Sequence, residues 1–108
     1  MNVTKLSDYT KGWIIGDFEP SIFRTKDFEV AVTKYKKDYK KPPHYHKECI
    51  EYNVLIEGRV TIQGTELNPG DVFVFEKGDV ADPIFHEDCT FVCVKVPSIP
   101  TDKYKVTK

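Results

Sequence analysis

Hydrophobic and polar residues alternate along much of this chain with the two-residue period of half-buried β-strands, and helical periodicity is nearly absent. The pattern predicts strands over 27–35, 51–57, 60–63, 72–75 and 88–96, and 12–16 is a further short apolar run bounded by glycines. In 27–35 the alternation makes Phe28, Val30 and Val32 the candidate core residues, with Tyr35 as a further candidate.

Turn signals separate these segments, among them Glu57-Gly58-Arg59 and Asn68-Pro69-Gly70-Asp71. Short strands joined by turns, with no helix between them, are typical of an antiparallel sandwich or barrel. We therefore expect an all-β fold. Residues 97–108 show no clear element, and we expect an extended tail that packs against the body or against a partner chain.

The length of 108 residues indicates one domain with a modest core. The formal net charge of −1 argues against a nucleic-acid-binding surface, which would be rich in Lys and Arg. No apolar stretch is long enough to cross a membrane. The lysine-rich run 34–41 is interpreted first as a solvated strand edge and second as an attractor of an anionic substrate.

The cysteines are Cys49, Cys89 and Cys93, an odd number in a sequence without a signal peptide. Cys89 and Cys93 would lie about 13 Å apart on one strand, too far for a disulfide. These features predict reduced thiols and a cytoplasmic location.

The segment 43–51 carries the strongest chemical signal, because His44 and His46 alternate with one residue and Glu51 follows. Side chains two residues apart on a strand share a face, with Cα atoms roughly 6.5 Å apart. Two imidazoles at that spacing can bind one divalent ion, and two histidines with a carboxylate are a common open ligand set.

The pattern His44-x-His46-x4-Glu51-x6-Gly58 resembles the first motif of the cupin superfamily, and Pro69-Gly70-Asp71 with the following strand and Gly78 resembles the start of the second. The resemblance implies a cupin-type jelly-roll β-barrel, or double-stranded β-helix, formed by one domain over 1–108 with 97–108 as its C-terminal tail. It also implies a pocket for a small-molecule ligand and a homodimer.

One position departs from the family pattern. The second motif usually supplies a histidine where this chain has Ala81, and Asp82 and His86 follow. A bulge would turn Asp82 inward as a further ligand; otherwise His44, His46 and Glu51 form a three-ligand site with open positions, or no metal binds. Such a site suits iron, manganese, nickel or zinc.

Other residues near the motif have simpler interpretations. Cys49 is expected to be a small buried group, with a thiolate ligand as the minority alternative. Tyr45 and Tyr52 should point away from the site by alternation. Trp13, Phe18 and Phe23 are expected in the core or at a dimer contact.

Three functions are consistent with this sequence. The first is a cupin that binds a divalent metal ion and a small ligand, such as a carbohydrate, with the reaction left open. The second is a metal-independent enzyme similar to nucleotide-sugar ketoisomerases or epimerases, because His44-Tyr45-His46-Lys47 resembles their His-x-His-Lys segment; His44 and His46 would act as acid and base. The third is a non-catalytic small-ligand-binding module.

Overall fold

The computed structural model describes residues 1–106 and is almost entirely β-structure. Two single 3-10 turns, Leu6–Asp8 and Thr10–Gly12, precede the first strand. Among the described residues no helix is long and apolar enough to cross a membrane. The strands are β1 (Trp13–Gly16), β2 (Phe23–Arg24), β3 (Glu29–Tyr35), β4 (His44–Tyr45), β5 (Ile50–Glu57), β6 (Val60–Ile62), β7 (Thr65–Leu67), β8 (Val72–Phe75), β9 (Ile84–Phe85), β10 (Cys89–Val96) and β11 (Tyr104–Lys105).

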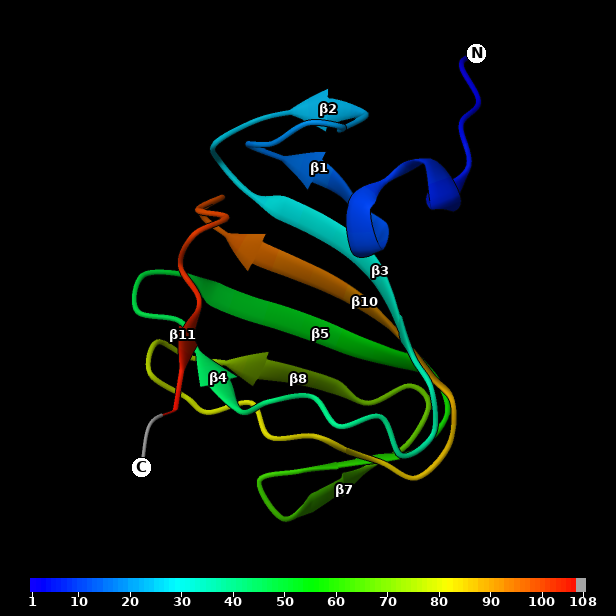
Figure 1. The fold of residues 1–108 in the computed structure, drawn as a ribbon, viewed down its shortest axis with the longest axis vertical. Helices are drawn as coiled ribbons and strands as arrows, with labels where there is room; N and C mark the ends of the chain where they lie inside the picture. Colours follow the sequence, from blue (N-terminus) through cyan, green and yellow to red (C-terminus); the bar gives the residue numbers. More distant parts are fainter. Residues whose placement is uncertain (107–108) are drawn as a thin grey trace.

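Most of the strands belong to a six-stranded sheet of order β2-β1-β3-β10-β5-β8 (Figure 1). All its pairs are antiparallel except β1 with β2. A three-stranded sheet, β7-β6-β9, and a two-stranded sheet, β11-β4, complete the fold. The predicted all-β class is thus confirmed. Over residues 1–106 the sheets remain three separate hydrogen-bonded ladders rather than one closed barrel.

The hydrophobic core lies between the large sheet and the three-stranded sheet. Leu55 and Phe91 of the large sheet pack with Val60 and Phe85 of the smaller one, and all four are buried. Burying a side chain of this size contributes about 1.5–3 kcal/mol. This cluster fixes the two layers against each other and holds open the space beside it.

Gly58 shows why the sequence motif ends in glycine. Its φ is +93°, and a Cβ at this position would lie 2.3 Å from the carbonyl oxygen of Asp88. Only glycine satisfies both constraints, so the turn from β5 to β6 can pass close to the start of β10.

The large sheet has an apolar outer face, and this corrects the predicted core of 27–35. Glu29 and Ala31 point inward and are buried, whereas Val30 and Val32 are only partly buried. Alternation gives the period of a strand but not which face is covered. The outer face continues across β5, β8 and β10 through Tyr52, Val54, Val72, Val74, Val92 and Val94.

The C-terminal segment packs against the body of the molecule up to Val106. Tyr104 and Lys105 of β11 pair with Tyr45 and His44 of β4. This segment therefore lies directly over the predicted histidine pair. Residues 107–108 of the predicted tail lie outside the described residues.

Candidate functional site

The structure brings His44, His46 and Glu51 together. His44 lies on β4 and His46 just after it, both are buried, and their ring centroids are 5.3 Å apart. Nε2 of His46 lies 3.3 Å from Oε1 of Glu51, which projects from β5. The turn between these strands folds the acid back onto the imidazoles, as the sequence spacing predicts.

The tail fixes the orientation of His46. Its Nδ1 contacts the backbone carbonyl of Asp102, and a carbonyl can only accept a hydrogen bond. Nδ1 therefore carries the proton, and a neutral His46 would present a lone pair at Nε2 to the Glu51 carboxylate. Two acceptors facing each other require a cation, either a proton on Nε2 or a metal ion.

Glu51 is held as a carboxylate. Burial alone raises its pKa, but the contacts with His46 and Asn53 and the charge of Lys95 outweigh burial and bring the pKa to about 2. Nδ2 of Asn53 donates to Oε2 of Glu51 over 2.9 Å. One carboxylate oxygen is thus occupied by Asn53, and the other faces His46.

His44 is held as a neutral imidazole. Burial, followed by the charges of Lys41 and Lys103, lowers its pKa to about 4. Its Nδ1 is buried without a hydrogen-bond partner among the described residues. A buried polar atom without a partner is costly, and a bound cation or ligand would satisfy it.

Ala81 occupies the place where the family pattern has a histidine. It exchanges two backbone hydrogen bonds with His44, of 3.2 and 2.8 Å, so the two side chains share a face. Ala81 lines the cavity. A methyl group therefore replaces a fourth ligand and leaves space beside His44.

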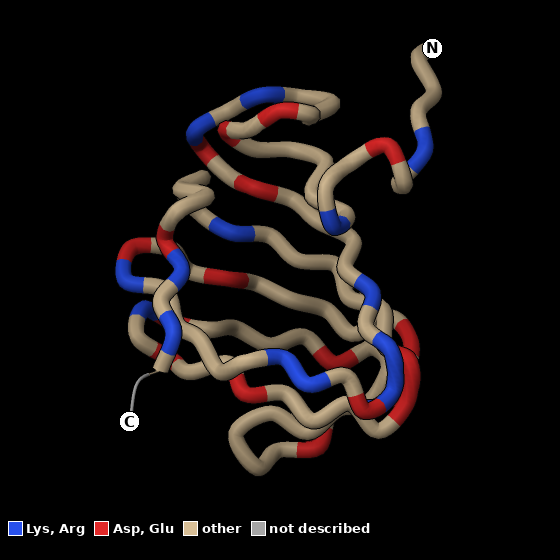
Figure 2. Tube along the Cα trace, viewed as in Figure 1, with Lys and Arg blue, Asp and Glu red and all other residues tan. Residues whose placement is uncertain are grey.

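A row of buried charges crosses three neighbouring strands at one end of the sheet. Lys95 of β10 stands in register with both Glu29 of β3 and Glu51 of β5, and the red, blue and red segments are visible in Figure 2. Nζ of Lys95 lies 3.3 Å from Oε1 of Glu29 and 4.6 Å from the centre of the Trp13 ring. Local sequence patterns did not indicate this row, because its residues are far apart in the sequence and only strand pairing brings them side by side.

Asp102 is a second site residue that the sequence did not reveal. Its buried carboxylate accepts backbone N–H groups from Lys47, Glu48 and Cys49 at 2.9–3.0 Å. Burial raises its pKa, but these hydrogen bonds outweigh that effect and lower it to about 2. Asp102 thus shapes the loop that leads from His46 to Glu51.

The remaining candidates lie elsewhere. Asp82 is exposed, and its carboxylate accepts the backbone N–H of Gln63 at 3.1 Å, so the structure does not bring it to the histidines. His86 contacts Thr61 over 2.7 Å. The buried Cys49 directs its thiol to the carbonyl of Pro97 over 3.3 Å. It is Cys93 that lines the cavity, and burial raises the pKa of its thiol.

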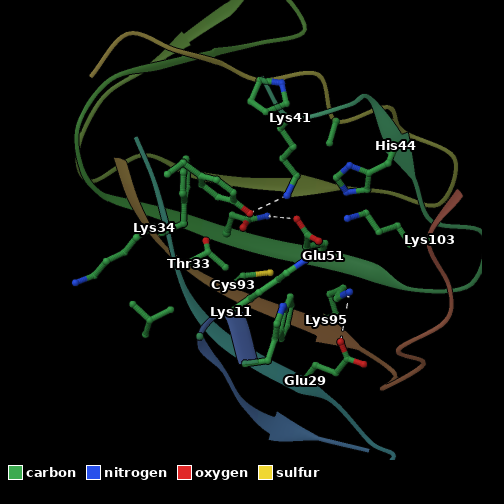
Figure 3. A pocket seen from close by; sticks show the side chains of 18 of the residues that line it. Lys11, Glu29, Thr33, Lys34, Lys41, His44, Glu51, Cys93, Lys95 and Lys103 are labelled. Carbon is green, nitrogen blue, oxygen red and sulfur yellow. Dashed lines mark hydrogen bonds and ion pairs between the residues drawn. The ribbon is translucent and has the colours of Figure 1, made fainter. Parts of the chain in front are cut away.

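The site opens into a cavity of about 1310 Å³ between the large sheet and the facing segments (Figure 3). Its floor is formed by inward residues of β3, β5, β8 and β10. Aromatic and charged side chains are mixed along its lining, since Lys41 lies over the Tyr35 ring and Lys95 over the Trp13 ring. Apolar and aromatic walls with a few polar groups are usual in a pocket for a small molecule.

The donor groups fit a divalent cation, although among residues 1–106 no three His, Cys, Asp or Glu side chains already form a metal-binding group. Two ligands at 2.0–2.1 Å from a tetrahedral ion lie roughly 3.3 Å apart, the separation found between His46 and Glu51. His44, whose Nδ1 has no partner among residues 1–106 and whose ring centre lies 5.3 Å from that of His46, is the candidate for a third donor.

Comparison with known proteins rests on structure. No model of a known protein family matches the sequence, and no curated protein matches it. An uncharacterised Klebsiella pneumoniae protein with a double-stranded β-helix domain is similar in structure, with a TM-score of 0.70 and 20% identity over 100% of this chain and 99% of that one.

Two enzymes are also similar in structure. The DMSP lyase DddQ from Ruegeria pomeroyi has a TM-score of 0.70 and 15% identity, over 93% of this chain and 54% of that one. A sugar phosphate isomerase of the cupin superfamily from Silicibacter pomeroyi has a TM-score of 0.60 and 24% identity, over 76% of this chain and 58% of that one. These likenesses, together with the motif around His44, show that the protein is a small β-protein with the cupin, or double-stranded β-helix, fold.

Proposed function

We propose that this protein binds a divalent metal ion through His44, His46 and Glu51 and acts on a small molecule held in the adjoining cavity. The observation that carries the proposal is the contact of 3.3 Å between His46 and Glu51, whose facing atoms both lack a proton when His46 is neutral. Iron, manganese, nickel and zinc suit this donor set.

A metal ion bound here would polarise a carbonyl or hydroxyl oxygen of the substrate. The residues of the chain have distinct roles around it. The Asp102 carbonyl holds the tautomer of His46, and Asn53 orients Glu51. The methyl of Ala81 leaves room for the substrate beside His44.

The direct test is metal binding by the purified protein, measured by elemental analysis and by competition with a chromophoric chelator. We expect stoichiometric metal in the wild type and a loss of affinity of roughly tenfold or more in His46→Ala and Glu51→Gln. His86→Gln is the matched control, because His86 contacts Thr61 outside the site. Equal metal content in the wild type and His46→Ala would exclude the metal site.

The same contact favours one alternative, a metal-independent acid–base enzyme acting on a keto sugar. An imidazolium at His46 would satisfy Glu51, while the pKa of about 4 keeps His44 neutral and able to accept a proton. Hydrogen–deuterium exchange into candidate keto sugars separates the two functions. Exchange that persists with excess chelator supports the alternative, and exchange that stops supports the metal.

A further inference from the structure

The cavity has more positive charge than its own carboxylates balance. Lysines line it from four segments of the chain: Lys11, Lys34, Lys36, Lys41, Lys95 and Lys103. Lys95 is paired with Glu29, and Lys36 lies 3.6 Å from Asp88. Lys11, Lys41 and Lys103 form no ion pair within residues 1–106.

Two of these lysines converge on the proposed metal site. In Figure 3 the side chains of Lys41 and Lys103 point toward Glu51 from different sides, whereas Lys34 points away. Nζ of Lys41 donates to the hydroxyl of Tyr35 over 2.7 Å, which holds the ammonium inside the cavity. Lys103 follows Asp102, so the segment that orients His46 also brings the Lys103 side chain to the cavity.

The charges of these lysines repel one another, although Lys11 and Lys103 are exposed and Lys41 is partly buried. Burial lowers the pKa of Lys103, and the charges of Lys41, Lys11 and Lys95 lower it further. Burial also lowers the pKa of Lys41. The nearest carboxylate to balance them, Glu51, is already engaged by His46 and Asn53. An anion bound between the lysines would relieve this repulsion.

We infer that the substrate is a small organic anion whose carboxylate or phosphate group is held by Lys41 and Lys103, with Lys11 nearby, beside the His44–His46–Glu51 centre. The inference rests on the proposed function for the reacting end of the substrate. A cavity of about 1310 Å³ accommodates an anion of the size of a sugar acid or sugar phosphate.

Binding of three matched sugars by isothermal titration tests the inference: glucuronate, glucose 6-phosphate and neutral glucose. We expect at least one charged sugar to bind and glucose not to bind, with affinity that falls as sodium chloride is raised. Whichever charged sugar binds identifies the anionic group. Binding of neither charged sugar, or equal binding of glucose, would overturn the inference.

Variants identify the groups responsible. Lys41→Gln and Lys103→Gln should weaken binding of the charged sugar by at least about tenfold each, since each removes a charge-assisted contact, and Lys103→Arg should retain it. Lys40→Gln and Lys105→Gln are matched controls, because these exposed neighbours do not line the cavity. Unchanged affinity in Lys41→Gln and Lys103→Gln would contradict the assignment, and melting curves without sugar show that each variant is folded.

The same titrations distinguish a failure of the anion site from a failure of the proposed metal site. The titrations are run on metal-free and on zinc-loaded wild type, and on His46→Ala. Charged-sugar binding without any metal binding would refute the metal site and leave the anion site. Metal binding that depends on His46, together with no preference for a charged sugar, would refute the anion site and leave the metal site.

Discussion

At the scale of single residues, the site contains one buried nitrogen without a hydrogen-bond partner among residues 1–106, and two hydrogen-bond acceptors that face each other. His44 has an unsatisfied Nδ1, and His46 faces Glu51 with no proton to share unless it is charged. Such arrangements are costly in a buried site. They are therefore better explained by a bound cation than by a purely structural role.

A gain of metal affinity should follow from Ala81→His. Ala81 and His44 are directly paired and their side chains share a face, so a histidine there adds a donor next to the existing ones. We expect the affinity for zinc to rise at least tenfold, which corresponds to about 1.4 kcal/mol. Chelator competition measures the change. Val80→His is the control one residue away, because Val80 does not line the cavity, and a similar gain there would contradict the assigned geometry.

The stability of the metal-free protein should fall between pH 6.5 and pH 4 because of His44. Its pKa is lowered from 6.5 to about 4 in the folded state, so over this window the unfolded chain binds more protons. The contribution of His44 is present above pH 6.5 and is lost as the pH falls, by on the order of 3 kcal/mol. Urea unfolding with chelator at several pH values measures it.

The matched variant for this pH dependence is His44→Gln, which has no titrating group at this position. Its unfolding free energy should change less over the same window. Glu51 and Asp102, whose pKa values are lowered to about 2, lose their contributions mainly below pH 4.5, so the two proteins are compared between pH 6.5 and 4.5. An identical slope in wild type and His44→Gln between pH 6.5 and 4.5 would show that His44 titrates normally.

At the scale of elements, the C-terminal segment completes the site from a distance in sequence. Asp102 binds three consecutive backbone N–H groups of the loop after β4 and positions His46 through its own carbonyl. We therefore regard Asp102 as a positioning residue.

Asp102→Ala should destabilise the fold by about 2–4 kcal/mol, because one buried and two partly buried backbone donors lose their acceptor. It should also weaken metal binding, since the loop that places His46 is no longer fixed. Asp79→Asn is the control, because Asp79 accepts one N–H in an exposed turn. Chemical unfolding and chelator competition give the two readouts. Full stability with unchanged metal affinity in Asp102→Ala would contradict the positioning role.

The sequence predicted the part of the site that is local and missed the part that is not. His44, His46 and Glu51 lie within one short segment, so strand geometry and the spacing were sufficient to place them together. Glu29, Lys95 and Asp102 reach the site only through pairing of distant strands. Asp82 shows the limit of the motif, because its carboxylate turns to the backbone of Gln63 instead.

At the scale of the whole molecule, the strands and turns were predictable, but the arrangement of the sheets was not. Alternation in 27–35 gave the strand and assigned the wrong face as core, since both faces of the large sheet are substantially apolar. The family resemblance supplied the fold. The separation into three ladders follows from hydrogen bonds that a single sequence does not specify.

The apolar outer face predicts a homodimer. Tyr52 pairs with Val74 and Val54 with Val72 across β5 and β8, and Val74 and Tyr52 are 40% and 45% exposed. None of the six residues that define this face is charged, so two copies can meet there without like-charge repulsion.

Light scattering coupled to size exclusion tests this assembly. The wild type should elute as a dimer and Val74→Lys as a folded monomer. Ile84→Lys, an exposed position on β9 away from this face, should remain dimeric. A monomeric wild type at all concentrations would contradict the prediction.

The central claim is that one divalent ion sits between His44, His46 and Glu51. Anomalous scattering from crystals of the protein loaded with zinc tests it most directly, with data collected on both sides of the zinc absorption edge. The account predicts a single strong peak within bonding distance of His46 Nε2 and Glu51 Oε1. A map with no peak there, or with zinc bound only at surface residues, would contradict it.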